Sequence, residues 1–275
     1  MPLFGATPDN PRQIAKQADE FLKKVYEDAR ANSPTEDQVV DVDKFCQMWV
    51  DKHPDPKTVG QHYDNIAEHV GYDGFNVWIN FVDPFFIAQT VADPEDPDDE
   101  FNFGFLNTPR DAKIFEVAQG TGLIGRLLTE KGFTHIDGVD ASEKFCQLAR
   151  ESGWYREITN QYLANGVNKL LTKWLGQYDV VFASGCFSKG HIQNPAGFDD
   201  VWAIMKVGGY FVTAFRTKYL EDDDELGYKA KLEGFRDQGR LEVVKTMTFM
   251  RGNNENPYPF FHEMTHMLVV FRKLA

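Results

Sequence analysis

Short apolar runs alternate with stretches of helical spacing through most of the chain. Residues 114–122 run from an apolar segment into a turn with glycines, residues 123–131 have helical spacing, and residues 138–142 form a second apolar run that reaches an acid. This order predicts a β-α-β unit. Parallel strands bring their carboxyl ends to one edge of a sheet, so the unit also predicts a nucleotide-type ligand site at that edge.

The alternation continues toward the C-terminus. Further strands are predicted over 157–163, 178–183, 208–215, 241–249 and 262–272, with helices over 195–205 and 225–238. The last two strands have no helix between them, so the sheet should close with a hairpin. We therefore predict an α/β fold with a doubly wound seven-stranded sheet, mostly parallel, with an antiparallel last strand.

The region before this unit is predicted to be helical. Apolar residues at three- and four-residue steps predict an amphipathic helix over 11–30, and a second helical stretch spans 42–52. We assign residues 1–58 to a helical appendage and residues 59–275 to the main domain. The appendage could pack on the sheet, cap a cleft or dimerise. Further along, Asp83 before a proline predicts a helix start, with Asp83 as N-cap.

Size and charge limit the classes of protein. The 275 residues, of which 42% are hydrophobic, suffice for one large α/β domain with an appendage. A net charge of −13 makes nucleic acid and anionic membranes poor partners. No apolar run reaches the roughly 20 residues that span a bilayer. Residues 1–5 lack the basic and apolar features of a secretory signal.

The three cysteines favour a reducing compartment. Cys46, Cys146 and Cys186 are odd in number and widely spaced, which suggests neither a disulfide framework nor a zinc site. No other constellation of metal-ligating residues is visible. We therefore expect a cytoplasmic protein that holds no metal.

The turn after the first strand could serve two kinds of ligand. Gly120, Gly122 and Gly125 fit the Gly-x-Gly-x-x-Gly spacing of dinucleotide sites, which alone is a weak signal. Glu116, at the end of the strand, would repel a diphosphate. S-adenosylmethionine has no phosphate and carries a cationic ammonium and a sulfonium, so an acid suits it. Asp140, at the end of the second strand, can bind both hydroxyls of a ribose.

The pattern Glu-x-Ala-x-Gly-Thr-Gly at residues 116–122 resembles motif I of the class I S-adenosylmethionine-dependent methyltransferases, and Asp140 resembles their ribose-binding acid. That family also has an antiparallel last strand. Two features depart from its pattern: Ala118 stands at the first glycine position, and Tyr162-Leu163 ends the third strand where many relatives carry an acid that binds adenine.

Three further segments, at 63–73, 182–191 and 213–217, are similar to a subgroup typified by the methyltransferase-like protein of the Williams–Beuren region. The resemblance covers about residues 61–244. It implies a cofactor site formed by Tyr63, Glu116, Ala118, Gly120, Thr121, Gly122, Asp140, Ala141, Tyr162, Leu163, Ser184 and Gly185.

Each of these assignments has a plainer structural alternative. The glycines could form an ordinary strand-to-helix turn, and Asp140 could be a helix N-cap, although Ser142 could take that role. Tyr63 could be a buried aromatic whose hydroxyl is satisfied within the protein.

Candidate acceptor-binding residues follow the later strands. They are Cys186, Phe187, Arg216, Tyr219, Tyr258 and Phe260. Arg216 could hold an anionic group of the substrate or pair with the acids of 221–225. Candidate general bases are His191, His62 and His262, which no spacing links to one another.

Together these features predict methyl transfer from S-adenosylmethionine, with S-adenosylhomocysteine as product, to a small organic acceptor. In-line displacement would rely mainly on proximity and orientation. The alternatives are a protein or peptide methyltransferase, a non-catalytic protein that binds the cofactor, and, most remotely, a nicotinamide-dependent oxidoreductase. We expect no nucleic-acid or membrane partner, and a monomer or homodimer.

Overall fold

The computed structural model describes residues 56–69, 72–92, 106–164, 166–221, 224–252, 254–255 and 262–275. The helices predicted over 11–30 and 42–52 lie outside these residues. The helical appendage therefore stays a prediction.

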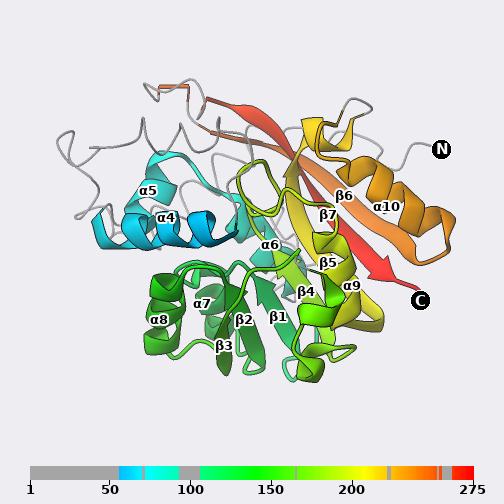
Figure 1. The fold of residues 1–275 in the computed structure, drawn as a ribbon, viewed down its shortest axis with the longest axis horizontal. Coiled ribbons are helices and arrows are strands. Elements are labelled where there is room, and N and C mark those ends of the chain that lie inside the picture. Colours follow the sequence, from blue (N-terminus) through cyan, green and yellow to red (C-terminus); the bar gives the residue numbers. More distant parts are fainter. Residues whose placement is uncertain are drawn as a thin grey trace, which may run out of the picture.

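A seven-stranded sheet in the order β3-β2-β1-β4-β5-β7-β6 forms the centre of the molecule (Figure 1). Its strands are β1 (Ile114–Val117), β2 (Ile136–Asp140), β3 (Glu157–Asn160), β4 (Tyr178–Ala183), β5 (Met205–Arg216), β6 (Leu241–Arg251) and β7 (Met264–Lys273). Neighbouring strands among β1 to β5 pair in parallel, and β7 is antiparallel to both β5 and β6. The predicted doubly wound sheet with an antiparallel last strand is confirmed.

Helices cover both faces of this sheet and one end of it. They are α4 (Pro56–His69), α5 (Tyr72–Trp78), α6 (Asp83–Val91), α7 (Leu123–Glu130), α8 (Glu143–Ser152), α9 (Gly197–Ile204) and α10 (Tyr228–Asp237). Short 3₁₀ turns are η1 (Val167–Lys169), η2 (Thr172–Trp174) and η3 (Thr217–Leu220). Helices α6 and α7 share one hydrophobic core with the sheet, and α9 and α10 share the other. Helices α4 and α5 lie across the end of the sheet (Figure 1).

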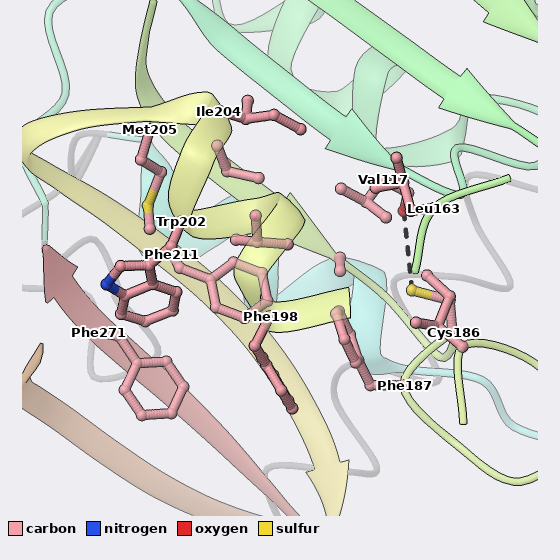
Figure 2. Packing of buried hydrophobic residues seen from close by; sticks show 14 of the residues in the cluster. Val117, Leu163, Cys186, Phe187, Phe198, Trp202, Ile204, Met205, Phe211 and Phe271 are labelled. Atoms are coloured by element: carbon pink, nitrogen blue, oxygen red, sulfur yellow. Dashed lines mark hydrogen bonds between the residues drawn. The ribbon is translucent and has the colours of Figure 1, made fainter. Parts of the chain in front are cut away.

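The alternation of side chains along each strand divides the apolar residues between these two cores. In β1, Phe115 and Val117 face the α9 and α10 side, and Ile114 faces α6 and α7. The first of these cores is rich in aromatic rings: Phe187 stacks on Phe198 with the ring centres 4.5 Å apart (Figure 2). The same alternation puts Glu116 on the side of Ile114, beneath α7.

Two strand boundaries differ by three residues from the prediction. Strand β5 begins at Met205 rather than 208, and the register shift against β4 together with the positive φ of Gly208 (86°) shows how a turn-like sequence continues as a strand. Strand β3 ends at Asn160 rather than 163, because the chain leaves the sheet there and the next residues line a cavity.

The N-cap prediction for Asp83 is wrong. Val82 occupies the N-cap position of α6 and makes no side-chain cap. Asp83 is fully buried, and its carboxylate lies 3.2 Å from Arg251 and 3.4 Å from His266. A buried carboxylate needs a charged or hydrogen-bonding partner, and the side chains of β6 and β7 supply it.

The ring of Tyr155 fills the space next to the glycines of the β1–α7 turn. A Cβ atom added at Gly125 would lie 2.3 Å from the Tyr155 ring, and one at Gly122 would lie 2.8 Å from it. The Tyr155 hydroxyl donates to Glu116 Oε2 at 2.6 Å. The absence of side chains at these two glycines therefore leaves room for the ring of Tyr155 between α7 and the sheet.

We expect Gly125→Ala to destabilise the fold by about 1–3 kcal/mol because the new methyl group overlaps the ring of Tyr155. Chemical denaturation measures the change. Gly234→Ala is the matched control, since Gly234 lies in α10 with nothing near its Cβ position, and it should be neutral or stabilising. Adding Tyr155→Ala should reduce the cost of Gly125→Ala; equal costs in both backgrounds would contradict the packing argument.

Candidate cofactor and acceptor site

A cavity lies where the strands end. Helices α4 and α5 supply Tyr63 and Tyr72 on one side, and the ends of β2 and β4 supply Asp140 and Ser184 on the other. Most of the lining is apolar or aromatic with a few polar groups among it, which is typical of small-molecule sites.

Asp140 is the polar centre of this cavity. Its Oδ2 accepts the backbone N–H of Gly120 at 3.0 Å, and its Oδ1 accepts the backbone N–H of Ser142 at 2.8 Å. These bonds hold the carboxylate at a fixed angle, and each oxygen keeps a lone pair for a further donor. Burial raises the pKa of Asp140 to about 6, so the carboxylate is charged at neutral pH.

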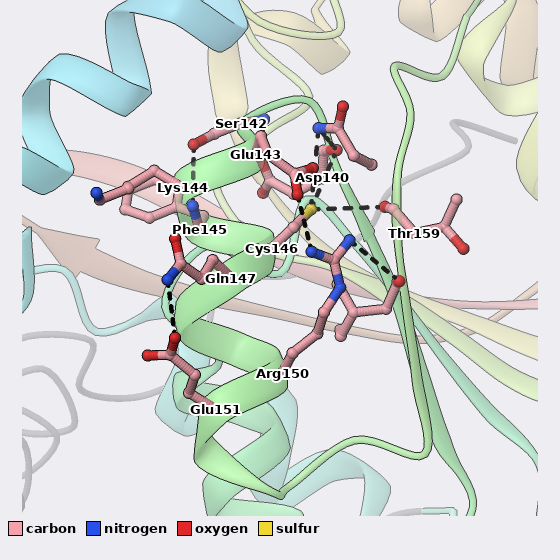
Figure 3. Close-up of polar contacts among 12 residues, drawn as sticks. Asp140, Ser142, Glu143, Lys144, Phe145, Cys146, Gln147, Arg150, Glu151 and Thr159 are labelled. Atoms are coloured by element: carbon pink, nitrogen blue, oxygen red, sulfur yellow. Dashed lines mark hydrogen bonds and ion pairs between the residues drawn. The ribbon is translucent and has the colours of Figure 1, made fainter.

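The capping role that Asp140 might have played belongs to Ser142. The Ser142 hydroxyl accepts the N–H of Phe145 at 3.1 Å and is the N-cap of α8 (Figure 3). Cys146, one turn further, points back to the carbonyl of Asp140 (Figure 3). The start of α8 therefore stabilises the end of β2 and leaves the Asp140 carboxylate available to a ligand.

The β1–α7 turn is linked to the helix that covers it. Ala118 and Gly120 both have a φ of 55°, so the turn is tight. The Thr121 hydroxyl donates to Asp73 Oδ1 at 2.6 Å and thereby ties the turn to α5. Helix α4 approaches as closely on the other side, because a Cβ at Gly60 would lie 2.6 Å from the carbonyl oxygen of Ala141.

Glu116 lies behind the turn rather than in the cavity lining. It is 3% exposed and bonds to Tyr155. Burial raises its pKa to about 8. The predicted contact of Glu116 with the cofactor ammonium stays a prediction, since the structure turns this side chain toward α7.

One of the three candidate histidines, His191, lines the cavity. Its Nε2 contacts the Tyr63 hydroxyl and its Nδ1 lies 2.9 Å from Ser188 Oγ. Burial lowers the pKa of His191 to about 4, so its imidazole is neutral at physiological pH. His62 and His262 are not among the lining residues.

Eleven of the predicted site residues gather around the cavity: Tyr63, Ala118, Gly120, Asp140, Ala141, Tyr162, Leu163, Ser184, Gly185, Cys186 and His191. Eight others line no part of it: Glu116, Thr121, Gly122, Phe187, Arg216, Tyr219, His62 and His262. Phe187 and Tyr219 belong to the hydrophobic core. Tyr258 and Phe260 lie outside the described residues.

Sequence reasoning missed the wall formed by α5 and the turn after it, and the arginine that ends β6. The wall residues are Tyr72, Phe75, Asn76, Ile79 and Phe81, and the arginine is Arg251. The wall reads as an ordinary amphipathic helix. For Arg251 the signal was available, since a lone cation ends a strand whose carboxyl end should lie at the ligand edge.

The groups that line the cavity suit the adenosine part of S-adenosylmethionine. Asp140 offers acceptors for ribose hydroxyls, and the segment after β3 offers Tyr162 and Leu163 as an apolar wall. A diphosphate fits poorly at the β1–α7 turn, because Tyr155 fills the space at Gly122 and Gly125.

The described residues include no group of three or more side chains that could hold a metal ion. Among the helices described, none is long and apolar enough to cross a membrane.

Comparisons with known proteins point in one direction. The human methyltransferase-like protein 27 is 31% identical over 134 residues, which cover 49% of this chain and 50% of that protein. A putative methyltransferase of Bacillus subtilis, YqeM, is 23% identical over 222 residues, covering 74% of this chain and 75% of that protein. The chain thus spans about half the length of its human relative.

Among solved structures, a SAM-dependent methyltransferase from Thermotoga maritima aligns over 79% of this chain and 100% of that one, with a TM-score of 0.47 and 15% identity. No family model matches the chain.

The sheet order, the position of Asp140 and the curated relatives agree. Both curated relatives are named methyltransferases, and the sheet of this chain has the strand order and antiparallel last strand expected from its resemblance to the class I S-adenosylmethionine-dependent methyltransferases.

The buried carboxyl of Glu116 should make stability depend on pH. Burial raises the pKa of Glu116 in the folded protein to about 8, above its value in the unfolded chain. Below the unfolded pKa the protonated carboxyl costs the fold no stability, and the free energy of unfolding falls as the pH rises from there toward 8. Glu116→Gln, which cannot ionise, should therefore exceed the wild type by about 2–4 kcal/mol above pH 8 and lose this advantage near pH 5. Denaturant unfolding across this pH range measures both proteins.

Glu242→Gln is the control, because this glutamate is half exposed on β6. A Glu116→Gln variant that is equally destabilised at every pH would contradict the assigned ionisation.

Proposed function

We propose that this protein transfers a methyl group from S-adenosylmethionine to a small organic molecule. Asp140 carries the proposal: its fixed carboxylate, at the end of β2, opens into a cavity that also reaches the end of β4. In the proposed pose the ribose lies on Asp140, and the reacting end lies near Ser184 and Cys186.

Bound S-adenosylmethionine would supply a methyl group already attached to a good leaving group. The protein's own contribution is then orientation and exclusion of water. Tyr63 and Tyr72 from α4 and α5 close the cavity over the strand ends, and burial raises the pKa of both phenols. Both hydroxyls therefore stay protonated, as donors, at neutral pH.

His191 is the proposed proton acceptor for a substrate that must lose a proton. It is neutral, lines the cavity and contacts the hydroxyl of Tyr63. Since Ser188 holds its other nitrogen, the imidazole has a fixed orientation. His62 is not in the lining, but its ring meets that of Tyr63 edge-on with the ring centres 5.7 Å apart.

The shape of the cavity favours a small acceptor over a peptide. Its walls include the rings of Tyr63, Tyr72, Phe75 and Phe81, which suit a compact organic molecule. Two Bordetella relatives named ubiquinone biosynthesis O-methyltransferase, 27% and 29% identical over 99 residues, are consistent with this class. A cytoplasmic location and a monomeric or dimeric state stay predictions.

Thermal unfolding tests the proposal. S-adenosylmethionine and S-adenosylhomocysteine should raise the midpoint, because a ligand that binds the native state stabilises it, and NAD should not. Asp140→Ala should weaken the binding of S-adenosylhomocysteine at least about tenfold, because it removes the acceptor of two charge-assisted hydrogen bonds.

Asp237→Ala, on the exposed end of α10, controls for loss of an acid and should leave binding intact. The proposed function would be refuted if NAD alone raised the midpoint, or if none of the three ligands raised it.

A further inference from the structure

A cluster of charged side chains lies on one face of the sheet, at the tips of β5, β7 and β6. Arg216, His266 and Arg251 alternate in phase with apolar residues of the α6 core, so all three face α6. Arg216 stands directly opposite His266 in the β5–β7 register. Asp83, the first residue of α6, lies beneath them and contacts both Arg251 and His266.

Arg251 is the member of this cluster that reaches the cavity. Its side chain is 13% exposed and lines the cavity together with Phe81 and Gly185. The Phe81 ring lies over the guanidinium, 4.2 Å from its carbon. Within the described part of the chain, Nη1 makes its one hydrogen bond, to Asp83 at 3.2 Å. Of the five N–H donors of an arginine, the other four have no hydrogen-bond partner among the described residues.

The neighbours of Arg251 set the charge and the position of this end of the cavity. Burial, and secondarily the like charge of Arg251, lower the pKa of Arg216 to about 10, so Arg216 is cationic at neutral pH. Burial lowers the pKa of His266, which is therefore neutral there. Asn80 donates to the carbonyl of Gly252 at 3.1 Å and fixes the end of β6 against the turn after α5.

This cationic end is opposite to the ribose end of the cavity. Asp140 ends β2, and Arg216 ends β5, three positions away in the sheet order, or about 14 Å at the usual strand spacing. Arg251 ends β6, the strand at the far edge. The end of β4, with Ser184 and Gly185, lies between them. A group held by the arginines would therefore lie on the acceptor side of the methyl group.

We propose that the acceptor is a small organic anion whose oxyanion group, a carboxylate or a phosphate, is bound by Arg251, while Arg216, which does not line the cavity, adds positive charge to this end. Arginine's planar fork matches both groups and gives them orientation as well as affinity. Asp83 and His266 act as positioning residues for Arg251. The inference rests on the proposed function and adds the charge of the acceptor to it.

Calorimetric titration of the full chain, saturated with S-adenosylhomocysteine, tests the proposal with benzoate, phenyl phosphate, benzamide and benzylammonium as probes. One of the two anions should bind at least about tenfold tighter than benzamide, which matches benzoate in shape but has no charge. Benzoate against phenyl phosphate then distinguishes the two oxyanions. Equal binding of benzamide, a preference for benzylammonium, or no binding of either anion would overturn the proposal.

The variants avoid leaving Asp83 buried without its partner. Asp83→Asn with Arg251→Met removes both charges together, and Arg216→Met removes the second cation. The double variant should abolish the preference for the anion, and Arg216→Met should reduce it; both should leave the affinity for S-adenosylhomocysteine within about threefold. Arg272→Met, a half-exposed arginine on β7 that pairs with Glu242, is the matched control and should change neither.

A parallel loss of S-adenosylhomocysteine affinity in the double variant would overturn the proposal, since Arg251 would then hold the cofactor's own carboxylate. Failure of the wild type to bind S-adenosylhomocysteine at all would refute the proposed function, and with it this inference.

Discussion

The two backbone hydrogen bonds to Asp140 are the constraint on which the rest of the site depends. The N–H of Gly120 comes from the β1–α7 turn and that of Ser142 from the start of α8, so one carboxylate joins the ends of two strands. Gly120 can donate because the turn is tight, and Ser142 can donate because it also caps α8. The position of α8 and the shape of the turn therefore follow from the same group that faces the cavity.

Charge is distributed unevenly along the cavity. The carboxylate of Asp140 faces the cavity at the end of β2, with the buried carboxyl of Glu116 behind the β1–α7 turn, and the guanidinium of Arg251 faces the cavity at the end of β6. Burial raises the pKa of both acids, so the free energy of unfolding falls as the pH rises. Acids with shifted pKa values of this kind are typical of ligand sites. Between the two ends the lining is mostly apolar. Such a cavity favours a ligand pair with hydroxyl donors at one end and negative charge at the other.

The sheet was largely predictable because each strand has its own apolar run and turn signals, and because the last two strands lack a helix between them. Asp140, Gly120 and the strand-end residues followed from the rule that parallel strands end at one edge. Glu116 shows the limit of that rule: the alternation of β1 turns its side chain beneath α7, and only the position of Tyr155 reveals this. Asp83 shows another limit. The residues around it resemble a helix cap, and nothing in them indicates an ion pair with an arginine 168 residues further along the chain.

The most direct test is a crystal structure of the complex with S-adenosylhomocysteine. The account predicts that both ribose hydroxyls bond to Asp140 and that the sulfur faces the end of β4 near Ser184 and Cys186. The cofactor's carboxylate should lie apart from Arg251. A complex in which the ribose makes no contact with Asp140, or in which the ligand lies outside this cavity, would contradict the account.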